Sequence, residues 1–117
     1  MHIGYVNVFV SDFDRAIDFY QNKVGLTPVQ ADAQFGYASF QAGAISFGIA
    51  VTDDSALVGR HTGIGFMVDD IDAAYAELLA SGVEFSQAPT KQPWGGTLAL
   101  FQDPDGNHYY LDPGHPH

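Results

Sequence analysis

The amino-acid sequence predicts an α+β fold made of two β-α-β-β-β modules that follow each other along the chain. Residues 3–10 and 62–68 each place apolar residues at every second position, as strands with one buried face do. These are Val6, Val8 and Val10 in the first segment and Ile64, Phe66 and Val68 in the second. Each segment is followed by apolar residues at helical spacing and then by a glycine. The two halves also match at one constant offset, which indicates an internal duplication. The matching pairs are Val10 and Val68, Asp12 and Asp70, Asp14 and Asp72, and Ala16 and Ala74.

The first module begins with a strand over residues 3–10, after which Asp12 is placed to cap a helix. The helical positions are Phe13, Ile17, Tyr20 and Val24. Gly25 is expected to end this helix. Three strands follow at residues 26–30, 34–41 and 44–51, separated by polar or glycine-containing breaks.

The second module repeats this order with a strand over residues 62–68 and Asp70 as the helix cap. The helical positions are Ile71, Ala74, Tyr75 and Leu78, and Gly82 ends the helix one residue earlier than Gly25 does in the first module. The last strands, 96–102 and 107–112, are joined by a tight Asp-Pro-Asp-Gly turn at residues 103–106. We therefore expect one domain of residues 1–114, with modules 2–51 and 62–113 and a linker at 52–61.

The composition of the 117-residue chain is that of a folded protein. Hydrophobic residues make up 46% of it and charged residues 15%, which is enough apolar material to offset the entropy of ordering the chain. No apolar run approaches the ~20 residues of a membrane span, and the first residues lack the pattern of a signal peptide. We therefore expect a cytoplasmic protein that does not bind membranes. The absence of cysteine excludes thiol catalysis and cysteine-ligated zinc.

The formal net charge of −10 argues against nucleic-acid binding. Only four basic residues are present, and they are too scattered to form a basic patch. These are Arg15, Lys23, Arg60 and Lys91. The acidic residues gather at the two helix starts and in the 103–106 turn, where carboxylates commonly bind free N–H groups. A cationic ligand is compatible with this charge, but the charge does not require one.

Alternation along the strands also predicts which side chains the helices leave uncovered. The helix-facing sets are Val6, Val8 and Val10 in the first strand, Ile64, Phe66 and Val68 in the fifth, and Tyr109 and Leu111 in the last. The opposite face then carries Tyr5, Asn7 and Phe9, then His61, Gly63, Gly65 and Met67, and finally His108, Tyr110 and Asp112. Glycines beside hydrogen-bonding and aromatic side chains are typical of a small-molecule cleft.

Four segments of the chain, in this order and on a duplicated module, carry a family resemblance. They read Val-Ser-Asp-Phe-Asp-Arg-Ala-Ile-Asp-Phe-Tyr at 10–20, Val-Gly-Leu at 24–26, Gln-Pro-Trp-Gly-Gly at 92–96 and Asp-Pro-Asp-Gly-Asn at 103–107. The chain resembles the vicinal oxygen chelate superfamily of glyoxalase I, bleomycin resistance proteins and extradiol dioxygenases. The resemblance implies a curved, partly open mixed sheet around a cleft, a homodimer and, in the enzymes, a divalent metal ion.

The resemblance also implies where the metal ligands of such enzymes would lie. Tyr5 stands where a first-strand histidine is usual, Gly63 at the equivalent position of the second module, and Tyr110 where the last strand usually supplies a glutamate. The remaining ligand belongs to the fourth strand, yet residues 41–52 contain no Asp, Glu or His. Since a metal site generally needs three or more protein ligands, we expect neither the usual site nor a bound cofactor.

Displaced histidines offer an alternative metal site. His61 and His108 each lie two residues before the expected positions and on the expected face, so they could bind a divalent ion together with Tyr5, Tyr110 or Asp112. The other histidines are weaker candidates, because they lie near the chain ends; these are His2, His115 and His117. In this alternative the protein is a metal-dependent lyase, isomerase or dioxygenase.

Without a metal, proton transfer would need a base such as His108 or His61 and a donor such as Tyr5 or Tyr110. Ordinary ligand binding by the same residues is the simpler interpretation. Trp94 is expected in a loop at the cleft entrance, where it could stack on a planar ligand, cover a sheet edge or contact a second copy. The predicted ligand-binding set is Tyr5, Asn7, Phe9, Ser46, Gly63, Gly65, Trp94, His108 and Tyr110.

The predicted function is the binding of a small organic molecule without the usual metal, for example the sequestration of a drug. A third class, an interaction module with a vestigial cleft, is favoured if Tyr5, Phe9 and Tyr110 fill the cleft.

Overall fold

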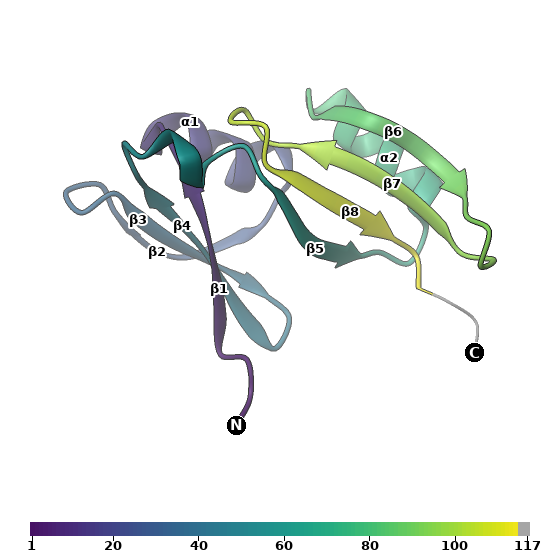
Figure 1. Cartoon of the computed structure of the whole chain (residues 1–117), viewed down its shortest axis with the longest axis horizontal. Helices are drawn as coiled ribbons and strands as arrows, with labels where there is room; N and C mark the ends of the chain where they lie inside the picture. Colours follow the sequence, from purple (N-terminus) through teal and green to yellow (C-terminus); the bar gives the residue numbers. More distant parts are fainter. Residues whose placement is uncertain (115–117) are drawn as a thin grey trace. The chain divides into compact units, whose positions relative to one another are not determined.

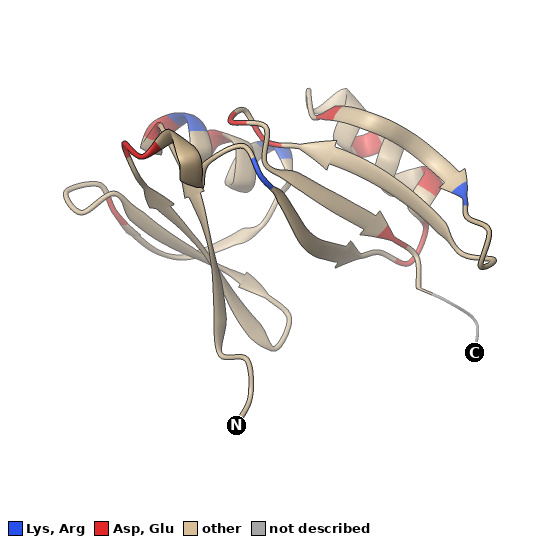
Figure 2. Ribbon diagram, in the orientation of Figure 1, with Lys and Arg blue, Asp and Glu red and all other residues tan. Residues whose placement is uncertain are grey.

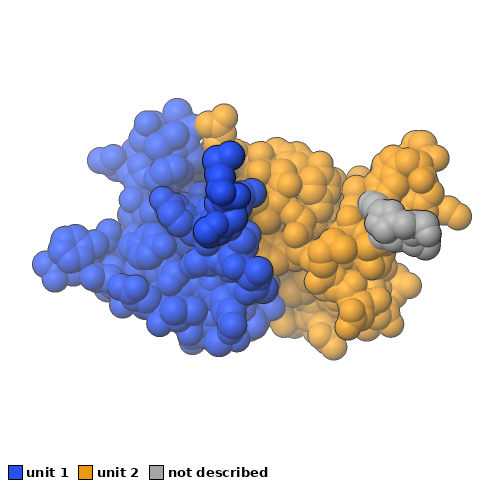
Figure 3. All heavy atoms as spheres, turned by 90° about the horizontal axis from the view of Figure 1, so that it is seen from below, with its two compact units in different colours: residues 1–59 blue, residues 60–117 orange. Residues whose placement is uncertain are grey.

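The computed structural model describes residues 1–114 and forms two compact units, residues 1–59 and 60–117 (Figure 1 and Figure 3). The first unit contains β1 (Tyr5–Val10), α1 (Phe13–Ile17), the π-helical η1 (Asp18–Lys23), β2 (Thr27–Asp32), β3 (Tyr37–Ala42), β4 (Ile45–Val51) and the 3-10 turn η2 (Ser55–Leu57). The second contains β5 (His61–Met67), α2 (Ile71–Ala80), β6 (Glu84–Lys91), β7 (Thr97–Gln102) and β8 (His108–Asp112).

Each unit is one four-stranded mixed sheet, and the two sheets have the same topology. The strand order is β1-β4-β3-β2 in unit 1 and β5-β8-β7-β6 in unit 2. The first and last strands of each unit pair in parallel, and the other neighbours pair antiparallel. This confirms the predicted α+β fold of two β-α-β-β-β modules.

Both predicted helix caps are present. The Asp12 carboxylate accepts a hydrogen bond from the Arg15 N–H at 3.0 Å, and the Asp70 carboxylate accepts one from the Ala73 N–H at 3.1 Å. Gly25 and Gly82 follow the two helices with φ of 87° and 94°, a left-handed conformation that glycine adopts without strain.

The first helix differs from the regular helix expected through Val24. It is α-helical only as far as Ile17 and then continues as a π-helix, in which the Val24 N–H donates to the Phe19 carbonyl at 2.9 Å. The first helical segment is one residue longer than the second, and a π turn takes up one extra residue while keeping the buried face in place.

Most strand boundaries also differ from the sequence prediction by one or two residues, and the start of the third strand differs by three. The third predicted strand begins at Tyr37 instead of residue 34, because the Asp32 carboxylate accepts hydrogen bonds from the Gln34 and Phe35 N–H groups and forms a turn there. The second strand extends to Asp32. The linker predicted at 52–61 contains η2, and its last residue, His61, is the first residue of β5.

One face of each sheet is buried with its helix. In unit 1 the rings of Tyr20 and Phe47 lie 5.3 Å apart, and both are almost fully buried. In unit 2 Tyr75 of α2 contacts Phe85 of β6 at 4.6 Å, while Phe101 and Tyr109 lie 5.4 Å apart in the core. Burial of each such aromatic side chain contributes roughly 1.5–3 kcal/mol, so these clusters hold the sheets and helices together.

Charged residues lie mainly on the helices, turns and strand ends (Figure 2). Asp12, Asp14 and Asp18 surround α1, and Asp70 and Asp72 begin α2, where they face the positive end of the helix dipole. Within residues 1–114, no helix combines the length and the apolar character needed to cross a membrane.

The cap of α2 provides a test of the fold. Replacing Asp70 by Ala leaves the Ala73 N–H without its acceptor, so we expect the free energy of unfolding to fall by about 0.5–2 kcal/mol in urea denaturation. Glu77→Ala, in the exposed middle of the same helix, is the control and is expected to change it by less than about 0.5 kcal/mol. Equal losses in the two variants would contradict the capping role.

Candidate functional site

The face of the unit 1 sheet opposite its core carries the side chains predicted for it. Tyr5, Asn7 and Phe9 are exposed. Val8, between Asn7 and Phe9, and Val10, at the end of the strand, are buried. Register pairing sets Tyr5 beside Ser46 and Asn7 beside Gly48. We call this surface the unit 1 open face; it comprises Tyr5, Asn7, Phe9, Tyr37, Gln41, Ser46 and Gly48.

Part of the unit 1 open face is filled by its own side chains. A Cβ added at Gly48 would overlap the side-chain amide oxygen Oδ1 of Asn7 and lie 2.8 Å from the Tyr37 hydroxyl oxygen. Asn7 therefore covers the backbone of β4 instead of projecting freely. Tyr5, which is 66% exposed, is the candidate of this face that stays most open.

The equivalent surface of unit 2 also follows the predicted alternation. Tyr109 and Leu111 are buried, while His108, Tyr110 and Asp112 between and beside them are half-buried. On β5 the exposed residues alternate with half-buried ones. We call this surface the unit 2 open face; it comprises His61, Gly65, Met67, His108, Tyr110 and Asp112.

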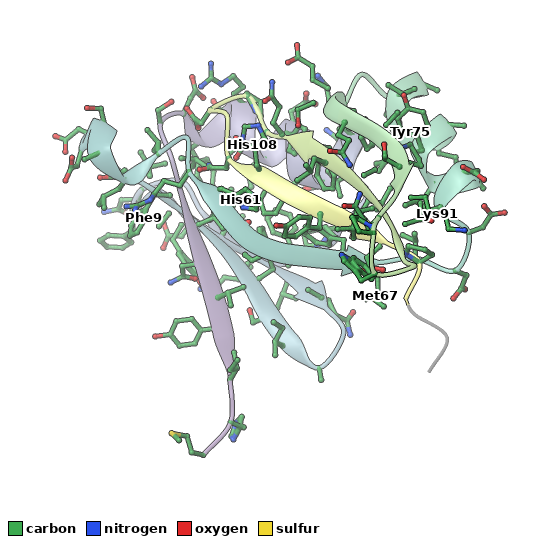
Figure 4. All side chains as sticks on the ribbon, turned by 45° about the vertical axis from the view of Figure 1, so that its right-hand side comes forward. Phe9, His61, Met67, Tyr75, Lys91 and His108 are labelled. Atoms are coloured by element: carbon green, nitrogen blue, oxygen red, sulfur yellow. The ribbon has the colours of Figure 1, made fainter. Side chains whose placement is uncertain are left out.

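Strand β5 is not regular, and the irregularity brings two candidate residues together. His61 pairs with His108 and Gly65 pairs with Tyr110, so two extra residues of β5 lie between the pairs, around Gly63 with φ of 72°. The regular alternation expected over 62–68 misses this bulge, which a positive φ makes possible at glycine. As a result the His61 ring lies 6.4 Å from the His108 ring and 5.0 Å from the Tyr110 ring, on neighbouring strands (Figure 4).

Backbone hydrogen bonds hold the two imidazoles in opposite tautomers. His61 Nδ1 accepts from the Gly63 N–H at 3.1 Å, so a neutral ring carries its proton on Nε2. His108 Nδ1 lies 2.8 Å from the Gly106 carbonyl oxygen, which can only accept, so this ring is protonated on Nδ1. When both rings are neutral, the outer nitrogen is therefore a donor on His61 and an acceptor on His108.

The turn before β8 holds His108 in place through two buried polar residues. The Asp103 carboxylate accepts from the Asp105 N–H, the Asn107 N–H and the Asn107 side-chain amide at 2.9–3.0 Å. The Asn107 side-chain oxygen accepts from the Arg60 N–H at 3.1 Å, one residue before β5 begins. The sequence predicts the turn but not the role of Asn107, whose signal is its place directly after the Asp-Pro-Asp-Gly segment.

Gly65 leaves room on the unit 2 open face. A Cβ built there meets only the Tyr110 Cβ, at 3.7 Å, among the described residues. Gly65 is the counterpart of Asn7 in the second module, because the two residues have the same spacing in the sequence as Val10 and Val68. Its neighbour on β8 is Tyr110. The large side chain thus lies on the first strand in unit 1 and on the last strand in unit 2.

Trp94 lies where the sequence predicts, in the loop between β6 and β7. The Gln92 N–H donates to the Gly96 carbonyl at 2.7 Å and closes this loop, and the indole is 55% exposed. Its role at a cleft entrance stays a prediction.

The donors present do not fit a metal ion well. No group of three His, Asp or Glu side chains within residues 1–114 is arranged to hold one. Asp112 is four residues from His108, about 13 Å along the strand, so its suggested role as a third ligand beside the histidine pair is wrong. A metal on His61 Nε2 would also move the proton to Nδ1 and remove the hydrogen bond from Gly63. His2 is exposed near the chain start, and His115 and His117 lie outside the described residues.

The two glycines provide matched substitutions. Gly65→Ala adds a methyl group in ordinary contact, so we expect the free energy of unfolding to stay unchanged or to rise by up to about 1 kcal/mol. Gly48→Ala must displace Asn7, so we expect a loss of about 1–3 kcal/mol. Chemical denaturation measures both, and adding Asn7→Ala should reduce the Gly48→Ala loss. Equal and additive effects at both sites would contradict this packing.

Comparison with known proteins identifies the scaffold. The sequence profile of the Glyoxalase/Bleomycin resistance protein/Dioxygenase superfamily matches residues 2–109. Protein YetH of Bacillus subtilis strain 168 is 30% identical, over 93% of this chain and 95% of its own length.

Two solved structures are similar over nearly the whole chain. A superfamily member from Sphaerobacter thermophilus is 31% identical with a TM-score of 0.81 and covers 96% of both chains. TnmS3, an antibiotic binding protein from Streptomyces sp. CB03234, is 29% identical with a TM-score of 0.82 and covers 96% of this chain and 94% of its own. The chain belongs to the glyoxalase/bleomycin resistance protein/dioxygenase superfamily.

Proposed function

We propose that this protein binds a small organic molecule on the sheet surfaces opposite the two cores, and above all on the unit 2 open face. The observation that carries the proposal is the room at Gly65, where an added Cβ meets only the Tyr110 Cβ among the described residues. The Tyr110 ring in turn lies 5.0 Å from the His61 ring, which lies 6.4 Å from the His108 ring. A ligand there gains aromatic contact and hydrogen bonds at the same time. Trp94 of the β6–β7 loop is a further proposed contact on unit 2, because its indole is 55% exposed. On unit 1 by itself, the 66% exposed Tyr5 is the proposed contact for a ligand on the unit 1 open face.

The likeness to TnmS3 supports a small organic ligand rather than a metal ion. TnmS3 is an antibiotic binding protein, and it shares its fold and 29% sequence identity with this chain. The proposed function does not require a cationic ligand. The carboxylates of Asp12, Asp70 and Asp103 accept hydrogen bonds from backbone N–H groups, which gives these acidic residues a structural role.

A metal-dependent lyase, isomerase or dioxygenase is the second candidate. The contact of His61 with His108 favours it, since two neighbouring imidazoles are a common part of metal sites. The tautomer of His61 and the distance to Asp112 count against it.

Thermal melting and elemental analysis test these functions. Protein purified without a nickel column is melted with planar cationic drugs and with α-keto and catechol compounds. A binder raises the melting temperature, since a ligand at about 100 times its Kd adds roughly 2.7 kcal/mol. Gly65→Leu should abolish the rise by filling the space beside Tyr110, whereas Gly4→Leu, at another open glycine, should retain it.

Two results would contradict the proposal. One tightly bound ion per chain that disappears in His108→Ala would establish the metal enzyme instead. No melting shift with any compound would favour the interaction module.

We also propose that the protein is a homodimer, as its family resemblance implies, and that β1 contributes to the contact. β1 is an edge strand of its sheet, and Ile3 and Tyr5 expose large apolar surfaces on and just before it. The cytoplasmic location stays a prediction from the sequence.

Light scattering should give the mass of two chains in solution. Tyr5→Asp should shift the protein toward one chain, because a carboxylate is costly to bury in an interface. Phe35→Asp, at a 76% exposed aromatic position in the β2–β3 turn, is the control and should leave the mass unchanged. A single-chain mass for the unmodified protein contradicts the dimer.

A further inference from the structure

We propose that the unit 2 open face recognises a neutral, planar ligand whose edge presents a carbonyl group next to an N–H or O–H group. His61 Nε2–H donates to the carbonyl, and His108 Nε2 accepts from the neighbouring N–H or O–H. This inference rests on the proposed function and names the class of ligand that the same face would bind.

The two tautomers make the histidine pair unsymmetrical. The inner nitrogen of each ring is occupied by backbone, through the Gly63 N–H on His61 and the Gly106 carbonyl on His108. Neither outer nitrogen has a hydrogen bond to another described residue. The ring centroids lie 6.4 Å apart and the ring planes are inclined by 24°. Two hydrogen bonds of about 2.9 Å to one small polar group are long enough to bridge rings at this separation.

Strand register places a polar row next to an apolar one. The row across β6, β7, β8 and β5 that contains the histidines is polar: Glu84, Gln102, His108 and His61. In the next row the apolar Leu100 and the Tyr110 ring lie between Gln87 at one end and Gly65, which has no side chain, at the other. A ligand with one polar edge and a flat apolar body matches both rows.

The donor and acceptor pattern selects against ions. A carboxylate offers only acceptors, so one of its oxygens would meet the lone pair of His108 Nε2. An amidinium offers only donors, so one of its N–H groups would meet the N–H of His61. A primary amide offers one of each and satisfies both rings.

Four compounds that share one benzene ring test this pattern: benzamide, N,N-dimethylbenzamide, benzoate and benzamidine. They are titrated into the isotope-labelled full-length protein at about pH 8.5, where neutral imidazole is favoured. We expect benzamide to bind about five- to tenfold more tightly than each of the other three, which is the loss expected for one hydrogen bond. His61→Ala and His108→Ala should each remove this preference, whereas His2→Ala, which changes an exposed histidine near the chain start, should keep it.

Long-range proton–nitrogen spectra of the same samples report the tautomers directly. We expect His61 to be protonated on Nε2 and His108 on Nδ1, with benzamide shifting both outer nitrogens. Identical tautomers, equal affinities for the four compounds, or no binding by any of them would overturn the inference. The proposed function fails separately, when the wider compound set described above gives no melting shift.

Discussion

Burial of one face of each sheet is the constraint on which the rest of the structure depends. Val8, Val10 and Phe47 in unit 1, and Phe101, Tyr109 and Leu111 in unit 2, are removed from water. Because side chains alternate along a strand, fixing these residues in the core sends their neighbours to the opposite face. Burial of the core residues therefore also decides which side chains lie on the opposite face. These are Tyr5 and Asn7 in unit 1 and His108 and Tyr110 in unit 2.

The duplicated frame allows the two open faces to differ. In unit 1 Asn7 covers Gly48, and the space above the backbone is occupied. In unit 2 the positions are exchanged, with Gly65 small and Tyr110 large, and the space beside the ring stays open. The same topology thus supports one face whose glycine is covered and one whose glycine is accessible, because the exchange changes side-chain volume without changing which face is buried.

Backbone geometry decides the chemistry of the accessible face. The bulge at Gly63 sets His61 beside His108 and supplies the N–H that fixes one tautomer. The 103–106 turn supplies the carbonyl that fixes the other, and the buried Asn107 ties this turn to the start of β5. Two chemically identical side chains thereby acquire opposite hydrogen-bonding roles, which residue type alone does not distinguish.

The sequence by itself determined the α+β modules, the caps at Asp12 and Asp70 and the Asp-Pro-Asp-Gly turn. It also determined the parity of the open-face candidates on β1, β5 and β8 other than Gly63, which lies in the β5 bulge. These features are local, since periodicity and capping involve residues within a few positions of each other. The tertiary structure decided the pairing of His61 with His108, the cover of Asn7 on Gly48, the π turn before Gly25 and the distance that removes Asp112 from the histidines. Those features depend on strand register and on a glycine with positive φ, and residues far apart in the chain set them together.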